Sequence, residues 1–195
     1  VSKYARNQVA GTQQPEAGAI FRVWLKSASS YAKAKDSERD MITVGKDGKG
    51  TSKSLPYGTY CLQQVSGWTG YDLDETIYEA AITEHGKTVT ADTSGNQLEL
   101  YNNIWTGKLT IRKVDGDTQE PLANAMFTLT GSDGSKQVVG TDGNGTAFFE
   151  NLVYGVTYTW TETSAPHGYL LDESNTGTWT VSKHDDSITV TCENK

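Results

Sequence analysis

Tyr-Thr-Trp-Thr-Glu-Thr-Ser-Ala-Pro-His-Gly-Tyr, residues 158–169, is the stretch that decides the fold. An earlier stretch of the same length also begins with tyrosine and ends with Gly-Tyr. Residues 60–64 read Tyr-Cys-Leu-Gln-Gln, and this segment also ends at a Gly-Tyr pair, Gly70-Tyr71. The closing tyrosines, Tyr71 and Tyr169, lie 98 residues apart. That offset exceeds the period of solenoid repeats, about 20–50 residues, and indicates a duplicated domain.

Two further motifs recur in the same order. A glycine-rich segment occupies residues 44–51 and 139–146, and a Leu-x-Tyr-Gly motif follows it at residues 55–58 and 152–155. The Asp-Gly pairs in the glycine-rich segments predict hairpins, because glycine accepts the positive φ that tight turns require. These pairs are Asp47-Gly48 and Asp142-Gly143.

The segments between these turns are typical of β-strands. They alternate in polarity or are rich in β-branched and aromatic residues, as at 108–114, 125–129, 157–161, 178–181 and 187–192. Short strands separated by turns predict an all-β chain of two tandem immunoglobulin-like β-sandwich domains, residues 1–104 and 105–195. Ser30–Glu38 is the one candidate helix.

Composition excludes several classes of protein. The chain has 195 residues and 24 acidic against 17 basic side chains, for a net charge of −7, without the basic cluster of a nucleic-acid-binding protein. No apolar run reaches the roughly 18–20 residues that span a bilayer, so we expect no membrane insertion here. The chain begins at Val1 without a signal peptide, and we expect a segment of a longer protein.

Several residues that suggest a ligand site have a simpler interpretation. The three histidines have no ligand spacing, which argues against zinc or a histidine-based triad. Asp115, Asp117 and Glu120 lack the EF-hand pattern and favour a solvated turn over calcium. Trp68 and Tyr71 favour core closure over a sugar platform. We therefore expect no metal and no cofactor.

The two cysteines fall in different halves of the chain. Cys61 belongs to the first copy of the repeat and Cys192 to the second. We expect both to be free thiols, because a disulfide needs two close cysteines.

Residues 158–169 resemble the E-box of collagen-adhesin B-type (Cna-B) domains and SpaA-like pilins of Gram-positive bacteria. That motif reads Tyr-x-Leu-x-Glu-Thr-x-Ala-Pro-x-Gly-Tyr, and only Trp160 in place of Leu departs from it. The flanking segments Lys113–Asp115 and Pro121–Phe127 resemble the family as well, as does the terminal Asn194. The resemblance covers residues 106–195, and the first half follows it more loosely.

The resemblance implies an autocatalytic isopeptide bond. In that family a first-strand lysine and a last-strand asparagine condense with the help of the E-box glutamate, which here names Lys113, Asn194 and Glu162. The chemistry is physically reasonable, because burial disfavours charge and a neutral buried amine is a nucleophile. A protonated carboxylic acid can polarise the asparagine carbonyl and transfer protons.

Strand alternation supports these three residues. Asn194 shares a face with Ile188, Val190 and Cys192 by two-residue periodicity. Glu162 likewise shares a face with Tyr158 and Trp160. The alternative is that the charged side chains lie on the surface or form an ordinary ion pair.

The first domain departs from the motif at the acid. Gln64 stands where Glu162 stands in the second copy, and a glutamine side chain does not exchange a proton near neutral pH. Lys3 matches the reactive lysine, although four more residues separate it from the next strand. The acceptor would be Asn102, which shares parity with Leu98 and Leu100, or its neighbour Asn103. A bond would need another acid, for which the candidates are Asp72, Glu75 and Glu79.

The sequence thus predicts a structural stalk segment of a Gram-positive cell-surface adhesin or pilus subunit, outside the cell and anchored through regions beyond this segment. Its partners would be neighbouring domains of the same surface protein or pilus. The alternative is a ligand-binding adhesin module that recognises a host extracellular-matrix protein or glycan. A turnover enzyme has little support, because no catalytic group recurs outside the cross-link site.

Overall fold

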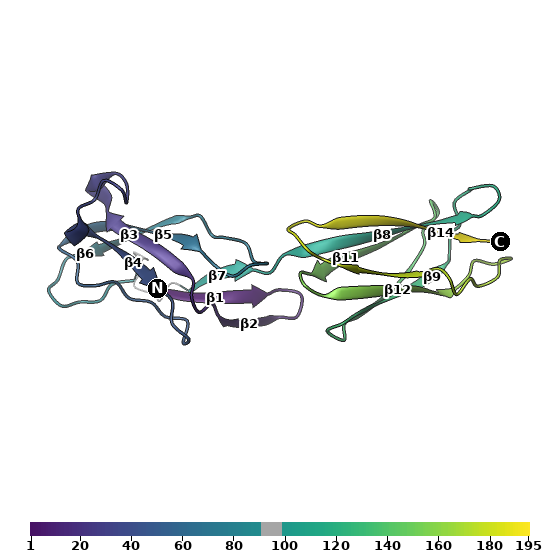
Figure 1. Cartoon of the computed structure of the whole chain (residues 1–195), viewed down its shortest axis with the longest axis horizontal. Helices are drawn as coiled ribbons and strands as arrows, with labels where there is room; N and C mark the ends of the chain where they lie inside the picture. Colours follow the sequence, from purple (N-terminus) through teal and green to yellow (C-terminus); the bar gives the residue numbers. More distant parts are fainter. Residues whose placement is uncertain (91–98) are drawn as a thin grey trace. The chain divides into compact units, whose positions relative to one another are not determined.

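The computed structural model describes residues 1–90 and 99–195, and the chain divides into two compact units, Val1–Ile104 and Trp105–Lys195. Each unit consists of two β-sheets (Figure 1). The prediction of an all-β chain with two tandem sandwich domains is confirmed. Leu98, one of the residues used to assign strand parity, lies outside the described residues.

The first domain has a three-stranded sheet in the order β2-β1-β7 and a four-stranded sheet in the order β4-β3-β5-β6. Its strands are β1 Ser2–Asn7, β2 Thr12–Pro15, β3 Ile20–Leu25, β4 Arg39–Thr43, β5 Gly58–Ser66, β6 Ile77–Ile82 and β7 Glu99–Asn103. The additional residues after Lys3 form β2, which pairs antiparallel with β1.

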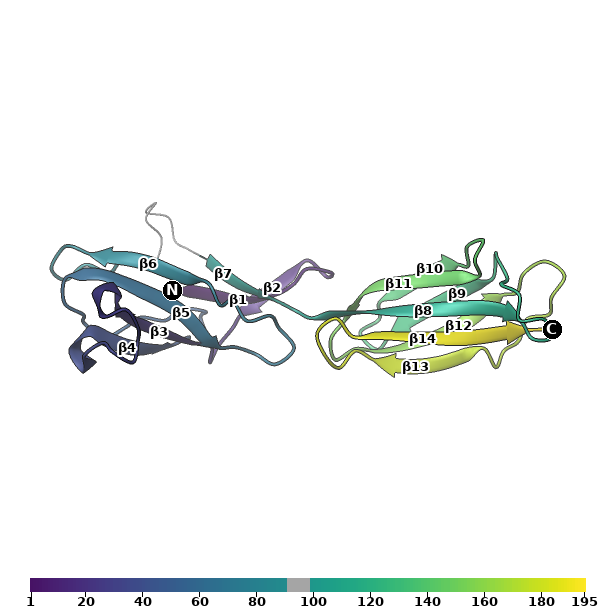
Figure 2. The same ribbon diagram turned by 90° about the horizontal axis from the view of Figure 1, so that it is seen from above.

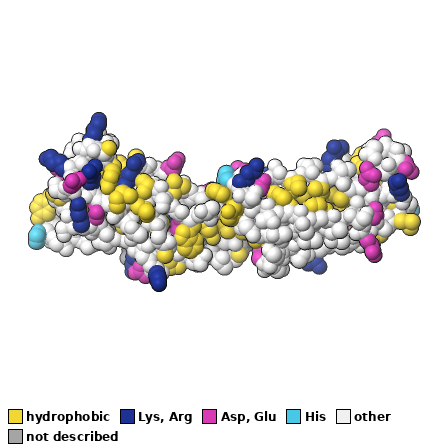
Figure 3. Space-filling view, in the orientation of Figure 1, with side chains coloured by type: hydrophobic (Ala, Val, Ile, Leu, Met, Phe, Trp, Pro, Cys, Tyr) yellow, Lys and Arg dark blue, Asp and Glu magenta, His cyan; other side chains and the backbone are white. Residues whose placement is uncertain are grey.

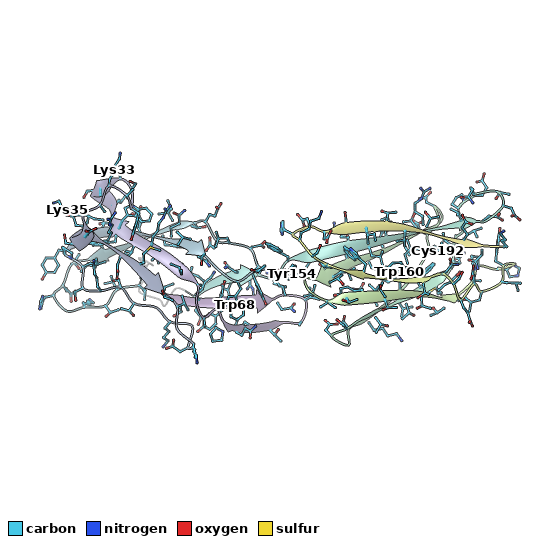
Figure 4. All side chains as sticks on the ribbon, in the orientation of Figure 1. Lys33, Lys35, Trp68, Tyr154, Trp160 and Cys192 are labelled. Carbon is cyan, nitrogen blue, oxygen red and sulfur yellow. The ribbon has the colours of Figure 1, made fainter. Side chains whose placement is uncertain are left out.

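The second domain has sheets in the orders β11-β8-β14 and β10-β9-β12-β13. Its strands are β8 Thr106–Asp115, β9 Met126–Gly131, β10 Lys136–Gly140, β11 Thr146–Val153, β12 Thr157–Ser164, β13 Thr176–Thr180 and β14 Ser187–Asn194. Leu109, Ile111, Phe127 and Leu129 alternate into the core, as two-residue periodicity requires. Trp160 joins the same cluster (Figure 4).

The first and last strands of each domain are parallel neighbours. β14 pairs with β8, and Figure 2 shows β8 between β11 and β14. Cys192 lies opposite Lys113 in this ladder, so Asn194 follows two residues further along on the same face. β7 pairs with β1 in the same way, with Leu100 opposite Lys3.

The helix predicted over Ser30–Glu38 is wrong. The structure has one short 3₁₀ turn within this range, Asp36–Glu38 (η2), and another just before it, Lys26–Ala28 (η1). Ala34 is the buried residue of this segment and packs in a small cluster with Trp24 and Cys61. The apolar surface that a helix could bury here is small, and short helices with little packing are marginal.

The hairpin prediction is also wrong. The turn at residues 142–145 connects β10 of one sheet to β11 of the other, so the flanking strands do not pair with each other. Gly48 and Gly145 have positive φ, 78° and 69°, whereas Gly143 does not. The backbone N–H of Lys3 donates to the Gly48 carbonyl, and that of Lys113 donates to the Gly145 carbonyl. These two glycines are therefore the equivalent pair.

None of the helices among the described residues is long and apolar enough to cross a membrane. Lys and Arg side chains are interspersed with Asp and Glu on the face drawn in Figure 3.

Candidate functional site

Lys113 is a fully buried lysine, with 0% of its surface exposed. It follows Leu109 and Ile111 on the inward face of β8, so the strand's alternation directs its side chain into the core. Its ammonium nitrogen lies 5.9 Å from the ring centroid of Phe127. A buried lysine is costly unless a partner compensates its charge or a reaction removes it.

Glu162 is the partner of Lys113. Its side chain is also fully buried, and its Oε2 lies 3.0 Å from Lys113 Nζ. Asn175 Nδ2 donates to the same oxygen at 2.7 Å. Glu162 Oε1 has no hydrogen-bond partner within the described parts of the chain. The hydrogen bonds of the Glu162 side chain within the described residues therefore converge on one oxygen.

Asn194, on β14, is the third buried polar residue, 1% exposed. Its Nδ2 donates to the Leu170 carbonyl, and its Oδ1 has no hydrogen-bond partner in the described residues. Because β14 adjoins β8 in parallel register, Asn194 and Lys113 occupy the same face of neighbouring strands. The structure thus places all three predicted residues inside one domain, with Lys113 and Glu162 in direct contact.

Asn175 is a residue of this site that the sequence did not identify. Its Nδ2 donates to Glu162 Oε2 and, at 2.7 Å, to the backbone carbonyl of Glu193. It therefore ties the carboxylate to the last strand. The residue lies in a polar turn before β13, and its sequence context contains no signal for this role.

Asp115 ends β8, and its side chain holds the turn that follows, where the sequence favoured a turn. Its carboxylate accepts hydrogen bonds from the backbone N–H groups of Asp117 and Thr118 and from the hydroxyl of Tyr169. These bonds lower the pKa of Asp115 to about 2, with the Thr118 N–H as the largest cause. No metal-binding group of three or more His, Cys, Asp or Glu residues occurs among the residues described.

Both cysteines are free and buried. Cys192 lies in the interior of the second domain (Figure 4), and burial raises its pKa to about 11. Trp68 is half-buried, donates its indole N–H to the Ala17 carbonyl at 2.8 Å, and meets Tyr71 edge-on.

The first domain contains a corresponding buried lysine. Lys3 is 0% exposed, and its Nζ donates to Asn102 Oδ1 at 2.6 Å. Asn102 is 1% exposed. Burial lowers the pKa of Lys3 to about 8, although Glu16 and Asp74 oppose that shift. The neighbouring amide, Asn103, instead accepts a hydrogen bond from Arg6, so Asn102 is the residue that contacts Lys3.

Gln64 occupies the position in the first domain that Glu162 occupies in the second, but it forms no hydrogen bond with Lys3 in the structure. It lies opposite Phe21, as Glu162 lies opposite Phe127, and its Nε2 donates to the Ser66 carbonyl. Its Oε1 has no hydrogen-bond partner within the described residues.

The acid beside Lys3 is Glu16, which the sequence analysis missed. Its side chain is 0% exposed, and its Oε2 lies 3.9 Å from Lys3 Nζ. Among the predicted carboxylates, Glu79 pairs with Lys26 at the surface and Glu75 is exposed. A signal for Glu16 existed in the repeat, because the equivalent position in the second domain is the apolar Leu122. Each of these two residues donates its backbone N–H to the carbonyl of the buried lysine.

Comparison with known proteins identifies the family. The chain belongs to the SpaA prealbumin-like fold domain family, whose model matches residues 7–97 and 107–195. The resemblance to SpaA-like domains is thereby confirmed. No curated protein sequence matches the chain.

Two solved structures share the architecture over the whole chain. The Bacillus anthracis TIE protein is 27% identical with a TM-score of 0.75, covering 100% of this chain and 33% of that one. This chain thus spans about a third of that relative. A C-terminal fragment of the pilus adhesin SpaC from Lactobacillus rhamnosus GG is 21% identical with a TM-score of 0.57. The match covers 100% of this chain and 95% of that fragment. The second likeness shows the fold alone.

Proposed function

We propose that this chain is a structural stalk segment of a Gram-positive cell-surface adhesin or pilus subunit, located outside the cell. An autocatalytic isopeptide bond between Lys113 and Asn194 would stabilise its second domain. The observation that carries the proposal is a fully buried lysine in contact with a fully buried glutamate, on the same face as an asparagine of the adjoining terminal strand. Membership of the SpaA family supports the setting.

The reaction needs the neutral amine of Lys113 to attack the side-chain carbonyl carbon of Asn194. Glu162 takes the proton from the amine and delivers one to the departing nitrogen. The new amide replaces the old one, and one ammonia leaves. The direct contact between Glu162 and Nζ supports this role in the first proton transfer, and burial of the site would exclude water from the intermediate.

The bond would act as a disulfide acts elsewhere. It would join the first strand to the last and remove loop-closure entropy from the unfolded chain, about 4 kcal/mol for a loop of this size. A covalently closed domain suits a segment that transmits force between an adhesive part and a cell wall.

Intact mass tests this proposal. In a Lys3→Ala background, where only the second domain can report, the chain should lack the mass of one ammonia. Lys113→Ala in that background should restore the full mass and lower the melting temperature. Glu162→Gln should leave the chain folded but unjoined. A full mass for the Lys3→Ala chain itself would disprove the second-domain bond.

A further inference from the structure

The first domain contains a buried polar cluster that the family motif does not account for, because its E-box position is a glutamine. Four side chains form the cluster: Lys3, Glu16, Gln64 and Asn102. All four are at most 3% exposed. A buried lysine beside a buried glutamate needs a physical explanation, since either side chain is rarely fully buried unless its charge is compensated.

The two oxygens of Glu16 face different atoms. Oε1 accepts a hydrogen bond from Asn102 Nδ2 at 3.1 Å, and Oε2 lies 3.9 Å from Lys3 Nζ. The Trp68 backbone N–H donates to Oε1 at 2.7 Å and fixes the carboxylate. One carboxylate therefore bridges an amine and the nitrogen of a side-chain amide. Those are the nucleophile and the leaving group of an amide exchange.

The side-chain carbonyl of Asn102 accepts two hydrogen bonds that would favour attack on its carbon. Its Oδ1 accepts hydrogen bonds from Lys3 Nζ at 2.6 Å and from the Asp74 backbone N–H at 3.2 Å. The first contact places the amine beside the carbonyl group. The second is a fixed donor at the oxygen on which negative charge develops when the carbonyl carbon is attacked.

The backbone leaves room for this arrangement only because residue 67 is glycine. A Cβ at Gly67 would lie 2.5 Å from Glu16 Oε1, 2.8 Å from Asn102 Nδ2 and 2.9 Å from Gln64 Nε2. Contacts under 3.0 Å would force these groups apart. The glycine thus permits the close approach of Glu16 and Asn102.

From this geometry we propose that Glu16 is the catalytic acid and base of a second isopeptide bond, Lys3–Asn102, in the first domain. The acid comes from the segment before β3, whereas in the second domain it comes from β12. The two domains thus differ at two equivalent positions. The first domain has Glu16 where the second has Leu122, and Gln64 where the second has Glu162. The first domain would therefore be cross-linked although it lacks the motif glutamate.

The step balances without a co-reactant. Lys3 Nζ forms a bond to Asn102 Cγ while the carbonyl electron pair moves to Oδ1. The proton released by Nζ passes to Glu16 Oε2. A proton from Glu16 reaches Nδ2, the electron pair on Oδ1 re-forms the carbonyl as the Cγ–Nδ2 bond breaks, and ammonia leaves. Glu16 is regenerated and the product is a secondary amide, with no oxidation or reduction.

The inference rests on the same chemistry as the proposed function, but its test is separate. In a Lys113→Ala chain the second domain cannot cross-link, so any ammonia missing from the intact mass was lost by the first domain. That chain should lack the mass of one ammonia, and a digest should yield a peptide joining Lys3 to Asn102. A full mass, or a link to Asn103, would overturn the proposal whatever the second domain does.

The acid is then tested in the same background. Glu16→Gln keeps the shape of the side chain, so its circular dichroism should match the parent while its mass is that of the unlinked chain. The double variant Glu16→Gln/Gln64→Glu should regain the link, because it returns the acid to the position used by the second domain. Glu75→Gln, an exposed carboxylate, is the matched control and should remain linked.

Asp74 is the rival acid, since its charge also acts on Lys3. Its carboxylate accepts a hydrogen bond from the Tyr78 hydroxyl at 2.7 Å, and no hydrogen bond joins it to Lys3 in the structure. A folded Glu16→Gln chain that is fully linked would overturn the role of Glu16. Linking that is lost in Asp74→Asn and kept in Glu16→Gln would assign the acid to Asp74 instead.

Discussion

Glu162 shares its hydrogen bonds unequally between its two oxygens. Oε2 receives both Lys113 and Asn175, whereas Oε1 has no hydrogen-bond partner in the described residues. A buried acceptor without a partner is unfavourable, and such groups are expected where chemistry occurs. Asn175 donates to the same oxygen as the lysine, so we expect it to act as a positioning residue for the second-domain reaction.

Replacement of Asn175 by alanine should slow cross-linking without preventing it. The glutamate would lose the donor that fixes its orientation, and small misplacements of reacting groups cost up to about a hundredfold in rate. The measurement is the fraction of chains that have lost ammonia over time after refolding, in a Lys3→Ala background. Ser174→Ala, an exposed neighbour, should cross-link at the parent rate. Equal rates for both variants would remove Asn175 from the mechanism.

Lys3 provides a pH-dependent prediction. In an Asn102→Ala chain, whose first domain cannot link, burial should hold the pKa of Lys3 near 8 in the folded state against 10.5 when unfolded. Between these values the unfolded state binds more protons, so the free energy of unfolding should rise with pH, by up to about 3 kcal/mol.

Urea denaturation of the first domain at pH 8 and pH 10 measures this rise. The added substitution Lys3→Met removes the titrating group, so its stability should change less over the same interval. Identical pH dependence in the two chains would mean that Lys3 does not titrate with a lowered pKa.

Single residues also show where sequence reasoning succeeds and where it stops. Lys113, Glu162 and Asn194 could be placed together because each lies in a strand whose alternation is readable. Glu16 could not, because it lies between strands, where no periodicity fixes the direction of a side chain. Its backbone approaches Lys3 because β2 pairs with β1, and the sequence did not predict β2.

The strands themselves follow their local chemistry closely. β8 buries alternate residues along most of its length, and β12 does the same through Tyr158, Trp160 and Glu162. The helix and hairpin predictions fail because they relied on local propensity alone, and packing elsewhere in the domain did not favour those structures. The segment from Ser30 to Glu38 has helix-forming residues but buries only Ala34 fully, and the Asp-Gly turn near residue 142 connects different sheets.

Pairing between β12 and β13 depends on a glycine. Gly177 lies opposite Trp160, and a Cβ at residue 177 would overlap the indole ring. Gly177→Ala should therefore destabilise the second domain by about 1–3 kcal/mol through overpacking. Thermal denaturation followed by tryptophan fluorescence in a Lys113→Ala background measures the loss. Gly143→Ala, which would meet no atom within 4 Å, should melt close to its parent. Equal melting temperatures would refute the overpacking argument.

At the scale of the whole molecule, the proposed bond changes which residues carry tension. With Lys113 joined to Asn194, a pull on the ends of the second domain follows β8 to Lys113 and crosses to β14. Residues 114–193 then lie outside the covalent path. The equivalent bond between Lys3 and Asn102 would exclude the segment between those two residues in the first domain.

Single-molecule extension measures this effect. Wild-type chain pulled by its two ends should show no release of residues 114–193, whereas Lys113→Ala should lengthen by on the order of 250 Å when its second domain unfolds. Lys108→Ala, an exposed lysine on the same strand, is the matched control and should behave like wild type. The same lengthening in wild type and Lys113→Ala would show that no covalent bond carries the load.

The parallel pairing of β8 with β14 has a mechanical consequence of its own. Because the strands run in one direction, Thr106 and Lys195 lie at opposite ends of the ladder, and tension drags the two strands past each other. Their hydrogen bonds are then loaded together in shear. Antiparallel neighbours pulled at a shared end would instead unzip bond by bond, at lower force. The second domain should therefore resist sliding even in a newly folded chain in which no cross-link has yet formed.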